Sequence, residues 1–101
     1  VYNLAPFSFF NGVCSNPPTL LFSVVRRGSD NQKKDTLNNI EATREFVVNI
    51  VSEPIAEQMN SCATEWPPDV NEFEQVGLTP VASSRVKPPR VGECAIAMEC
   101  H

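Results

Sequence analysis

Runs of hydrophobic residues, separated by polar and proline-containing segments, organise this chain of 101 residues. Residues 19–25 are almost wholly apolar, which predicts a strand buried on both faces. Residues 45–51 are rich in β-branched side chains and predict a second strong strand. Shorter apolar runs predict strands at residues 78–82 and 95–100. The pattern therefore favours several short strands spread along the chain.

The N-terminal segment, residues 3–14, mixes aromatic and small side chains around a single proline. Because Pro6 cannot donate a hydrogen bond to a strand ladder, it belongs at a sheet edge or a bend. This segment therefore predicts an edge strand or an extended segment that faces a ligand. The following Asn16-Pro17-Pro18 predicts a turn, since each proline fixes its own φ and restricts the residue before it.

Three short helices are expected between the strands. The first covers residues 36–43, with Asp35 as its N-cap. The second covers residues 52–63, where Ser52 can cap the helix and Pro54 suits its first turn.

The third helix begins with a capping-box pattern, in which Glu72 follows Asp69 by three residues. We expect this helix to run to about residue 75, because Gly77 is a natural stop. In this pattern Glu72 has a local role at the start of its own helix.

Short strands with small helices between them predict a mainly β chain with short helices. It could form either an α+β domain or a barrel with helical inserts. The four or five strands expected here are too few to close a barrel, so one sheet edge would stay open. We therefore expect missing strands at both ends, or a partner that supplies them.

The composition fits one ordinary globular domain, with 42% hydrophobic and 20% charged residues. The net charge of −4 argues against nucleic acid as a partner, because binding a phosphate backbone needs a basic surface. No apolar run reaches the length of a membrane span. The chain begins with Val1 and carries no signal-sequence pattern, which indicates a fragment or a processed form.

The four cysteines, Cys14, Cys62, Cys94 and Cys100, contain no C-x-x-C pair, and His101 is the only histidine. A zinc site would need a closer pair and more ligands, so we expect no metal. A core of this size does not need a disulfide framework, which favours four reduced thiols and a cytoplasmic setting. With the only histidine at position 101, the sequence offers no well-fixed Ser–His or Cys–His nucleophile pair.

The triplet Lys34-Asp35-Thr36 at the start of the first helix is a candidate anion site. A helix N-terminus offers unpaired N–H groups and the positive end of its dipole, and Lys34 and the Thr36 hydroxyl would add to them. Arg26 stands at the end of the preceding strand and is close enough in sequence to bend back. In the simpler alternative, Asp35 caps a surface helix and Lys34 is solvated, and spacing alone favours this alternative.

The aromatic opening segment is a candidate site for a flat heterocycle. Asn3 and Ser8 can hydrogen-bond the edge of such a ring, while Ala5 lets the backbone approach it and Phe9 could stack on its face. The alternative places all three phenylalanines of the segment in the core. The core placement and the ligand contact are evenly balanced for Phe9, and the core placement is favoured for Phe7 and Phe10. A heterocycle and a phosphate together indicate flavin mononucleotide (FMN).

Seven motifs resemble the flavin reductase-like family of FMN-binding split barrels, and they follow in order along nearly the whole chain. They are NLAPFSFFNGV at residues 3–13, SNPP at 15–18, KDTLNNI at 34–40, EFVVNI at 45–50, GLTPV at 77–81, VKPPRV at 86–91 and MEC at 98–100.

The resemblance implies a Greek-key split β-barrel that forms a homodimer and holds FMN near the subunit interface. The family pattern has a strand before residue 3 and further strands after residue 101. We therefore expect residues 1–101 to be a single, truncated domain of this kind. The residues it implies for the isoalloxazine border are Asn3, Leu4, Ala5, Ser8 and Phe9. Those for the ribityl and phosphate path are Ser15, Ser23 and Arg26, and those for the phosphate end are Lys34, Asp35 and Thr36.

The resemblance also implies an activity, the transfer of hydride from NADH or NADPH to the flavin. The flavin carries this chemistry, so no catalytic side chain is needed. Two alternatives stay open: a non-catalytic FMN-binding protein or electron carrier of the same fold, and a structural fragment without cofactor.

Overall fold

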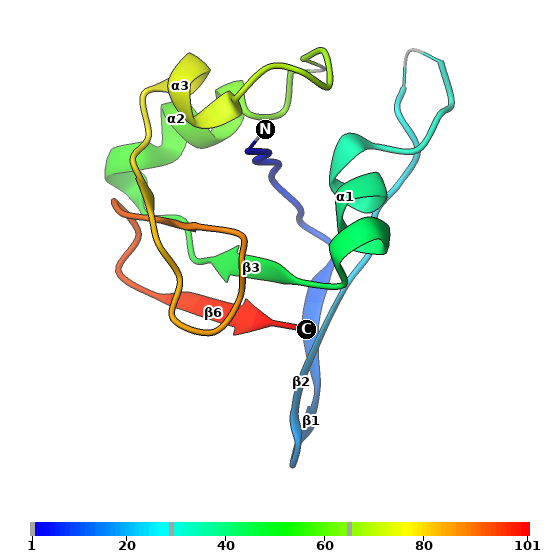
Figure 1. The fold of residues 1–101 in the computed structure, drawn as a ribbon, viewed down its shortest axis with the longest axis vertical. Coiled ribbons are helices and arrows are strands. Elements are labelled where there is room, and N and C mark those ends of the chain that lie inside the picture. Colours follow the sequence, from blue (N-terminus) through cyan, green and yellow to red (C-terminus); the bar gives the residue numbers. More distant parts are fainter. Residues whose placement is uncertain (1, 29, 65) are drawn as a thin grey trace.

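Three antiparallel strand pairs carry the fold in a computed structural model, which describes residues 2–28, 30–64 and 66–101 (Figure 1). The pairs are β1 (Phe10–Ser15) with β2 (Pro18–Phe22), β3 (Phe46–Asn49) with β6 (Ala97–Cys100), and β4 (Pro80–Val81) with β5 (Arg90–Val91). Each pair is its own two-stranded sheet. The described residues are thus mainly β with short helices, and their sheets do not close into the expected barrel.

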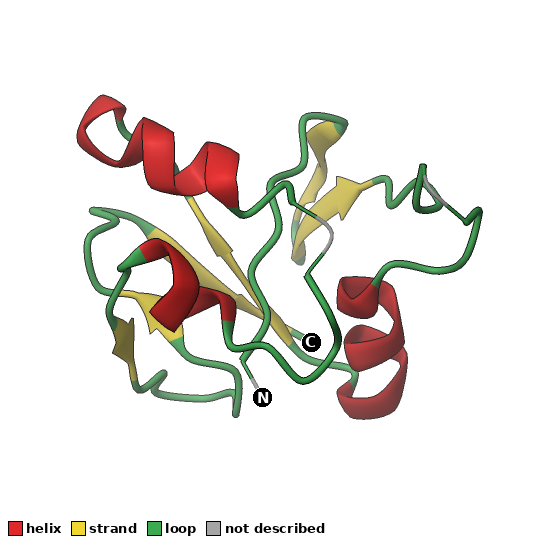
Figure 2. Cartoon of the chain, turned by 90° about the horizontal axis from the view of Figure 1, so that it is seen from above, coloured by secondary structure: helices red, strands yellow, loops and turns green. Residues whose placement is uncertain are grey.

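Short helical segments lie around these strands (Figure 2). They are α1 (Asp35–Thr43), the 3₁₀ segment η1 (Glu53–Ile55), α2 (Ala56–Ser61) and α3 (Glu72–Val76). None of the helices in the described part of the chain is long and apolar enough to cross a membrane.

The β1–β2 hairpin projects from the rest of the molecule (Figure 1). It turns at Asn16-Pro17, as expected, through a cis peptide bond. A bulge lies between Gly12 and Cys14, because Gly12 pairs with Leu20 while Cys14 pairs with Thr19.

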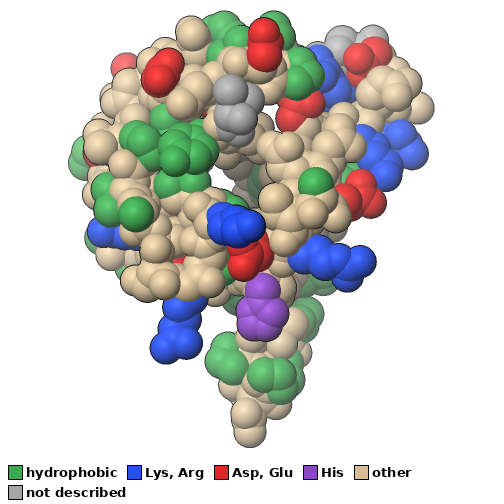
Figure 3. Space-filling view, in the orientation of Figure 1, with side chains coloured by type: hydrophobic (Ala, Val, Ile, Leu, Met, Phe, Trp, Pro, Cys, Tyr) green, Lys and Arg blue, Asp and Glu red, His purple; other side chains and the backbone are tan. Residues whose placement is uncertain are grey.

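The prediction of a strand over residues 19–25 that is buried on both faces is wrong in its length and in its burial. β2 ends at Phe22, and Leu21 is 56% exposed. In the described structure β2 pairs only with β1, so the outer face of the hairpin is left uncovered. Hydrophobic side chains accordingly gather on the surface of the hairpin (Figure 3). An apolar run indicates that burial of the strand would be favourable. Whether the strand is buried depends on which other elements cover it.

The other two strand pairs are joined by a side chain. The Asn49 side-chain oxygen, on β3, accepts a hydrogen bond of 2.9 Å from the Val91 N–H on β5. The strands predicted at residues 45–51, 78–82 and 95–100 are confirmed as the shorter β3, β4 and β6. β5 was missed, because the prolines before it indicate a loop.

The helix ends differ from the expected caps. Lys34 is the N-cap residue of α1, and Asp35 is its first helical residue, so Asp35 does not cap the helix. The helix expected at residues 52–63 is divided into η1 and α2, with Ser52 at the N-cap position and Pro54 in the first turn. The Ser52 side chain makes no capping hydrogen bond.

The capping box expected at the start of α3 is also wrong. Asn71 is the N-cap, and its side-chain oxygen accepts a 3.0 Å bond from the Phe73 N–H. Because Asn71 caps the helix, Glu72 does not have the capping role that the sequence suggested. Gly77 ends the helix with a φ of 79°, in the left-handed region that glycine adopts without strain, as predicted.

The core lies beside α3, away from the hairpin. Its buried residues are Ile55, Phe73, Leu78, Val91 and Cys94, with Leu4 and Val76 packed against them. Phe73 is 1% exposed, and the ring of Tyr2 meets it edge-on at a centroid distance of 5.8 Å. The N-terminal segment is therefore anchored to the core at Tyr2 and Leu4.

This arrangement predicts a large loss of stability when Phe73 is replaced by Ala. Removing a fully buried phenyl ring should lower the free energy of unfolding by about 3–5 kcal/mol. The matched control is Phe9→Ala, because Phe9 is 67% exposed. We expect that control to change stability by less than about 0.5 kcal/mol. Urea unfolding measures both, and equal losses would contradict this placement of the core.

Candidate functional site

A large cavity of about 870 Å³ opens between the N-terminal segment, α1 and β3. Its volume lies within the range of about 300–1,000 Å³ that is usual for small-molecule sites. Segments far apart in sequence meet there, including residues 2–8, 45–51 and 87–89. The cavity thus brings together several of the motifs that carry the family resemblance.

A row of aromatic rings forms part of the cavity wall. The centroids of Phe7 and Phe22 are 5.0 Å apart, and those of Phe22 and Phe46 are 5.3 Å apart. The Lys34 ammonium lies 5.3 Å from the centroid of the Phe7 ring, a cation–π distance. A positive charge at the start of α1 is thereby held next to an aromatic surface.

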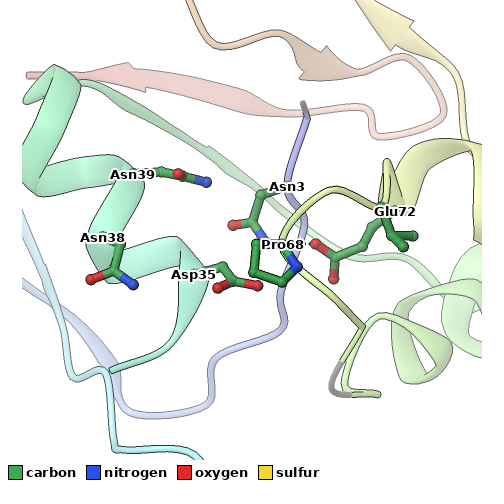
Figure 4. A pocket seen from close by; sticks show the side chains of 7 residues that line it. Asn3, Asp35, Asn38, Asn39, Pro68 and Glu72 are labelled. Atoms are coloured by element: carbon green, nitrogen blue, oxygen red, sulfur yellow. Dashed lines mark hydrogen bonds between the residues drawn. The ribbon is translucent and has the colours of Figure 1, made fainter. Parts of the chain in front are cut away.

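A smaller cavity of about 270 Å³ is lined by Asn3 together with residues of α1 and of the segment around α3 (Figure 4). Its lining is mostly polar, with Asp35, Asn38 and Asn39 on α1 and Glu72 on α3, and Pro68 and Val70 complete it. Asn3 and Asn39 line both cavities, so they form part of the wall between them.

Three side chains form a hydrogen-bonded bridge in this wall. The Thr36 hydroxyl donates a 2.6 Å bond to the side-chain oxygen of Asn3. The Asn3 amide nitrogen donates a 2.5 Å bond to Glu72 Oε1, and the Leu4 N–H donates to the same oxygen at 3.1 Å. The N-terminal segment is therefore held between α1 and α3 (Figure 4).

Glu72 is an acid in a buried position, with 6% of its surface exposed. Burial raises the pKa of Glu72, while the hydrogen bonds from Leu4 and Asn3 oppose the rise and the charge of Asp35 adds to it. Burial, assisted by the charge of Glu72, likewise raises the pKa of the Cys62 thiol to about 11. Cys62 is therefore a protonated thiol at neutral pH.

The structure brings together seven of the eleven predicted site residues. Asn3, Leu4, Ala5, Ser8 and Thr36 line the large cavity. Lys34 lies over Phe7 at its margin, and Asp35 faces the smaller cavity. The predicted ring segment and the predicted phosphate site thus lie next to each other.

The other four predicted residues lie along the hairpin and the loop that follows it. Phe9 is largely exposed, and its carbonyl accepts a 2.9 Å bond from the Ser23 N–H. Ser15 is in the last pair of the hairpin, opposite Pro18. The Arg26 guanidinium donates a 3.3 Å bond to the Asn31 carbonyl. The roles of all eleven residues toward a ligand stay predictions.

The sequence interpretation missed the long-range role of Glu72 and the contribution of Phe22 and Phe46 to the cavity. One signal for Glu72 was present, because Glu72 and Val76 are four residues apart and share a helix face. Val76 packs on the core, so the same face also points Glu72 inward.

Comparison with known proteins shows the family. Residues 2–101 match the model of the flavin reductase like domain. The chain belongs to this family. A protein from Aquifex aeolicus without an assigned function is 52% identical to this flavin reductase-like chain over 100 residues, which cover 99% of the chain and 50% of the relative.

Two solved structures resemble this flavin reductase-like chain closely. Nitrilotriacetate monooxygenase component B from Bacillus cereus superposes with a TM-score of 0.89 at 41% identity, covering 97% of this chain and 48% of that one. Flavoredoxin of Desulfovibrio vulgaris (Miyazaki F) has a TM-score of 0.83 at 26% identity, covering 96% and 50%. The chain thus spans about half the length of the relatives it matches. The similar structures also include a protein with a split barrel domain from Shewanella frigidimarina, with a TM-score of 0.82 at 29% identity, covering 96% of this chain and 46% of that one.

The buried position of Glu72 predicts a specific pH dependence of stability. Since the folded-state pKa is raised, folding favours the protonated carboxyl. The associated stabilisation is present below the unfolded-state pKa and is lost as the pH rises through the folded-state pKa. The wild type should therefore gain stability relative to Glu72→Gln as the pH falls from neutrality toward the ordinary glutamate pKa of 4.5.

Urea unfolding of both proteins across this pH range measures the difference. Glu74→Gln, on the exposed side of the same helix, is the control and should follow the wild type. A difference that stays constant, or that changes in the opposite direction, would show that Glu72 is not held in a buried environment.

Proposed function

We propose that this chain is the FMN-binding part of an NAD(P)H-dependent flavin oxidoreductase. The observation that carries the proposal is the meeting of an aromatic cavity with the start of α1, where Lys34 lies over Phe7. Membership of the flavin reductase like family supports the choice of a flavin. Residues 1–101 would form one domain of a longer, cytoplasmic and homodimeric protein.

The cavity suits the ring system of a flavin. Its apolar and aromatic wall, which includes Phe7 and Phe22, provides surface for a planar heterocycle. Asn3 and Ser8 add polar groups at one side. This combination of a mostly apolar wall and a few polar groups is typical of cofactor sites.

The start of α1 suits the phosphate. The helix has nine residues, and Lys34 at its N-cap position has no side-chain oxygen that could accept a hydrogen bond from the first N–H groups. The helix dipole and the Lys34 ammonium both favour an anion there. Asp35 lines the smaller cavity, so the phosphate would approach from the side of Lys34 and Thr36.

When bound, FMN would accept a hydride from NADH or NADPH and pass electrons onward. The chain's own residues would bind and orient the flavin. The aromatic wall would exclude water from one side of the ring, and Lys34 with the helix start would hold the phosphate. Ser15, Ser23 and Arg26 would serve the ribityl and phosphate path, with Phe9 at the ring border.

A non-catalytic electron carrier is the second candidate, because a flavoredoxin is among the similar solved structures. The two functions differ in one measurable property. A reductase oxidises NADH or NADPH at steady state when FMN is supplied, whereas a carrier does not. Absorbance at 340 nm follows that reaction, and the absence of turnover in a protein that binds FMN would favour the carrier.

The proposed phosphate site predicts that Lys34→Ala weakens FMN binding and leaves riboflavin binding unchanged. Losing a charge-assisted contact should raise the dissociation constant for FMN about tenfold. Lys33→Ala is the matched control, since Lys33 lies one position earlier and pairs with Glu41 at 2.9 Å. Quenching of flavin fluorescence measures each constant.

Two results would contradict the proposal. Wild-type protein that binds neither FMN nor riboflavin would favour a structural fragment without cofactor. Equal effects of Lys34→Ala on both flavins would show that Lys34 does not contact the phosphate.

A further inference from the structure

Glu72 makes more contacts with the N-terminal segment than its position in a short helix requires. Its Oε1 accepts bonds from Asn3 and Leu4, which are 69 and 68 positions away in the sequence. Its own N–H donates to the Tyr2 carbonyl at 3.4 Å. One residue of α3 thus holds three consecutive residues of the segment.

The segment depends on these bonds because it is not part of a sheet. Residues 2–7 have neither helical nor strand structure, so a strand ladder does not fix their position. Burying a carboxylate costs free energy unless it is well bonded, and here one oxygen serves two donors. The buried Glu72 side chain therefore supplies hydrogen bonds to a segment that has no strand partner.

The same bridge continues to the start of α1. Asn3, held by Glu72 through its amide nitrogen, accepts the Thr36 hydroxyl through its oxygen. Residues 5–8, which line the large cavity, follow directly after the anchored positions. Thr36 lies two residues beyond Lys34, at the proposed phosphate site. The bridge therefore connects the ring-binding segment with the phosphate-binding helix start.

We propose that Glu72 is a positioning residue for the flavin: through Asn3 and Leu4 it sets the spacing between the ring-binding segment and the start of α1. This inference rests on the proposed FMN site. FMN spans both places, whereas riboflavin lacks the phosphate and occupies only the ring site. Correct spacing therefore matters for the preference for FMN over riboflavin more than for binding of the ring itself.

The test compares FMN and riboflavin affinities in the wild type, Glu72→Ala, Glu72→Gln and Glu74→Gln. In Glu72→Ala the preference for FMN should fall at least about fivefold, because the Asn3 and Leu4 donors lose their shared acceptor. Glu72→Gln keeps an oxygen acceptor and should retain the preference within about twofold. Glu74→Gln is the control on an exposed position of the same helix.

The preference separates positioning from general support of the fold. A purely structural loss lowers both affinities by the same factor and leaves their ratio unchanged. If Glu72→Ala does not fold, Glu72→Asp takes its place: it keeps the carboxyl group, shortens the reach by one methylene and should lower the ratio in the same direction.

If the ratio of FMN to riboflavin affinity is unchanged in Glu72→Ala and Glu72→Asp, or in whichever of them folds, the positioning role is overturned. The proposed function would still stand if the wild type binds FMN. If neither variant folds, Asn3→Ala decides: it removes the link between Glu72 and Thr36, so the ratio should fall in the same direction, and an unchanged ratio overturns the role. Wild-type protein that binds neither flavin would overturn both proposals.

Discussion

The hydrogen bonds between the buried Glu72 carboxylate and residues 3–4 are the contacts on which the rest of the site depends. They link the N-terminal segment to α3 on one side and, through Asn3 and Thr36, to α1 on the other. The two cavities share this link as a wall. Without it, the segment that carries most of the predicted ring contacts would be held mainly by Tyr2 and Leu4 against the core.

The molecule divides its hydrophobic residues between two regions with different roles. Around Phe73 they pack closely and supply stability. Along Phe7, Phe22 and Phe46 they line an open space, so their apolar surface is left for a ligand or for further chain. This division explains how a chain with an ordinary hydrophobic content has a small core. A site of this size is made from side chains that would otherwise be packed together.

Local signals in the sequence predicted most of the elements, and long-range contacts account for what they missed. The β-branched run of β3 and the glycine that ends α3 act locally, and both are found as predicted. β5 follows prolines that indicate a loop, and its support comes from pairing with β4 and from a hydrogen bond to Asn49, which lies 42 positions away. Glu72 was misread for the same reason, because its partners Asn3 and Leu4 lie 69 and 68 positions away, while Asn71 supplies the cap. The predicted ring and phosphate residues came from motifs, and the fold placed seven of them side by side.

The bulge in the β1–β2 hairpin limits how the hairpin can associate with other strands. Val13 is the extra residue between two paired positions, so the hydrogen-bonding groups of β1 fall out of step halfway along the strand. A neighbouring strand could stay in register with one half of β1 only. An exposed, apolar hairpin can act as a template to which further strands add without control. The inserted Val13 interrupts this template, and both strands can still pack through their side chains.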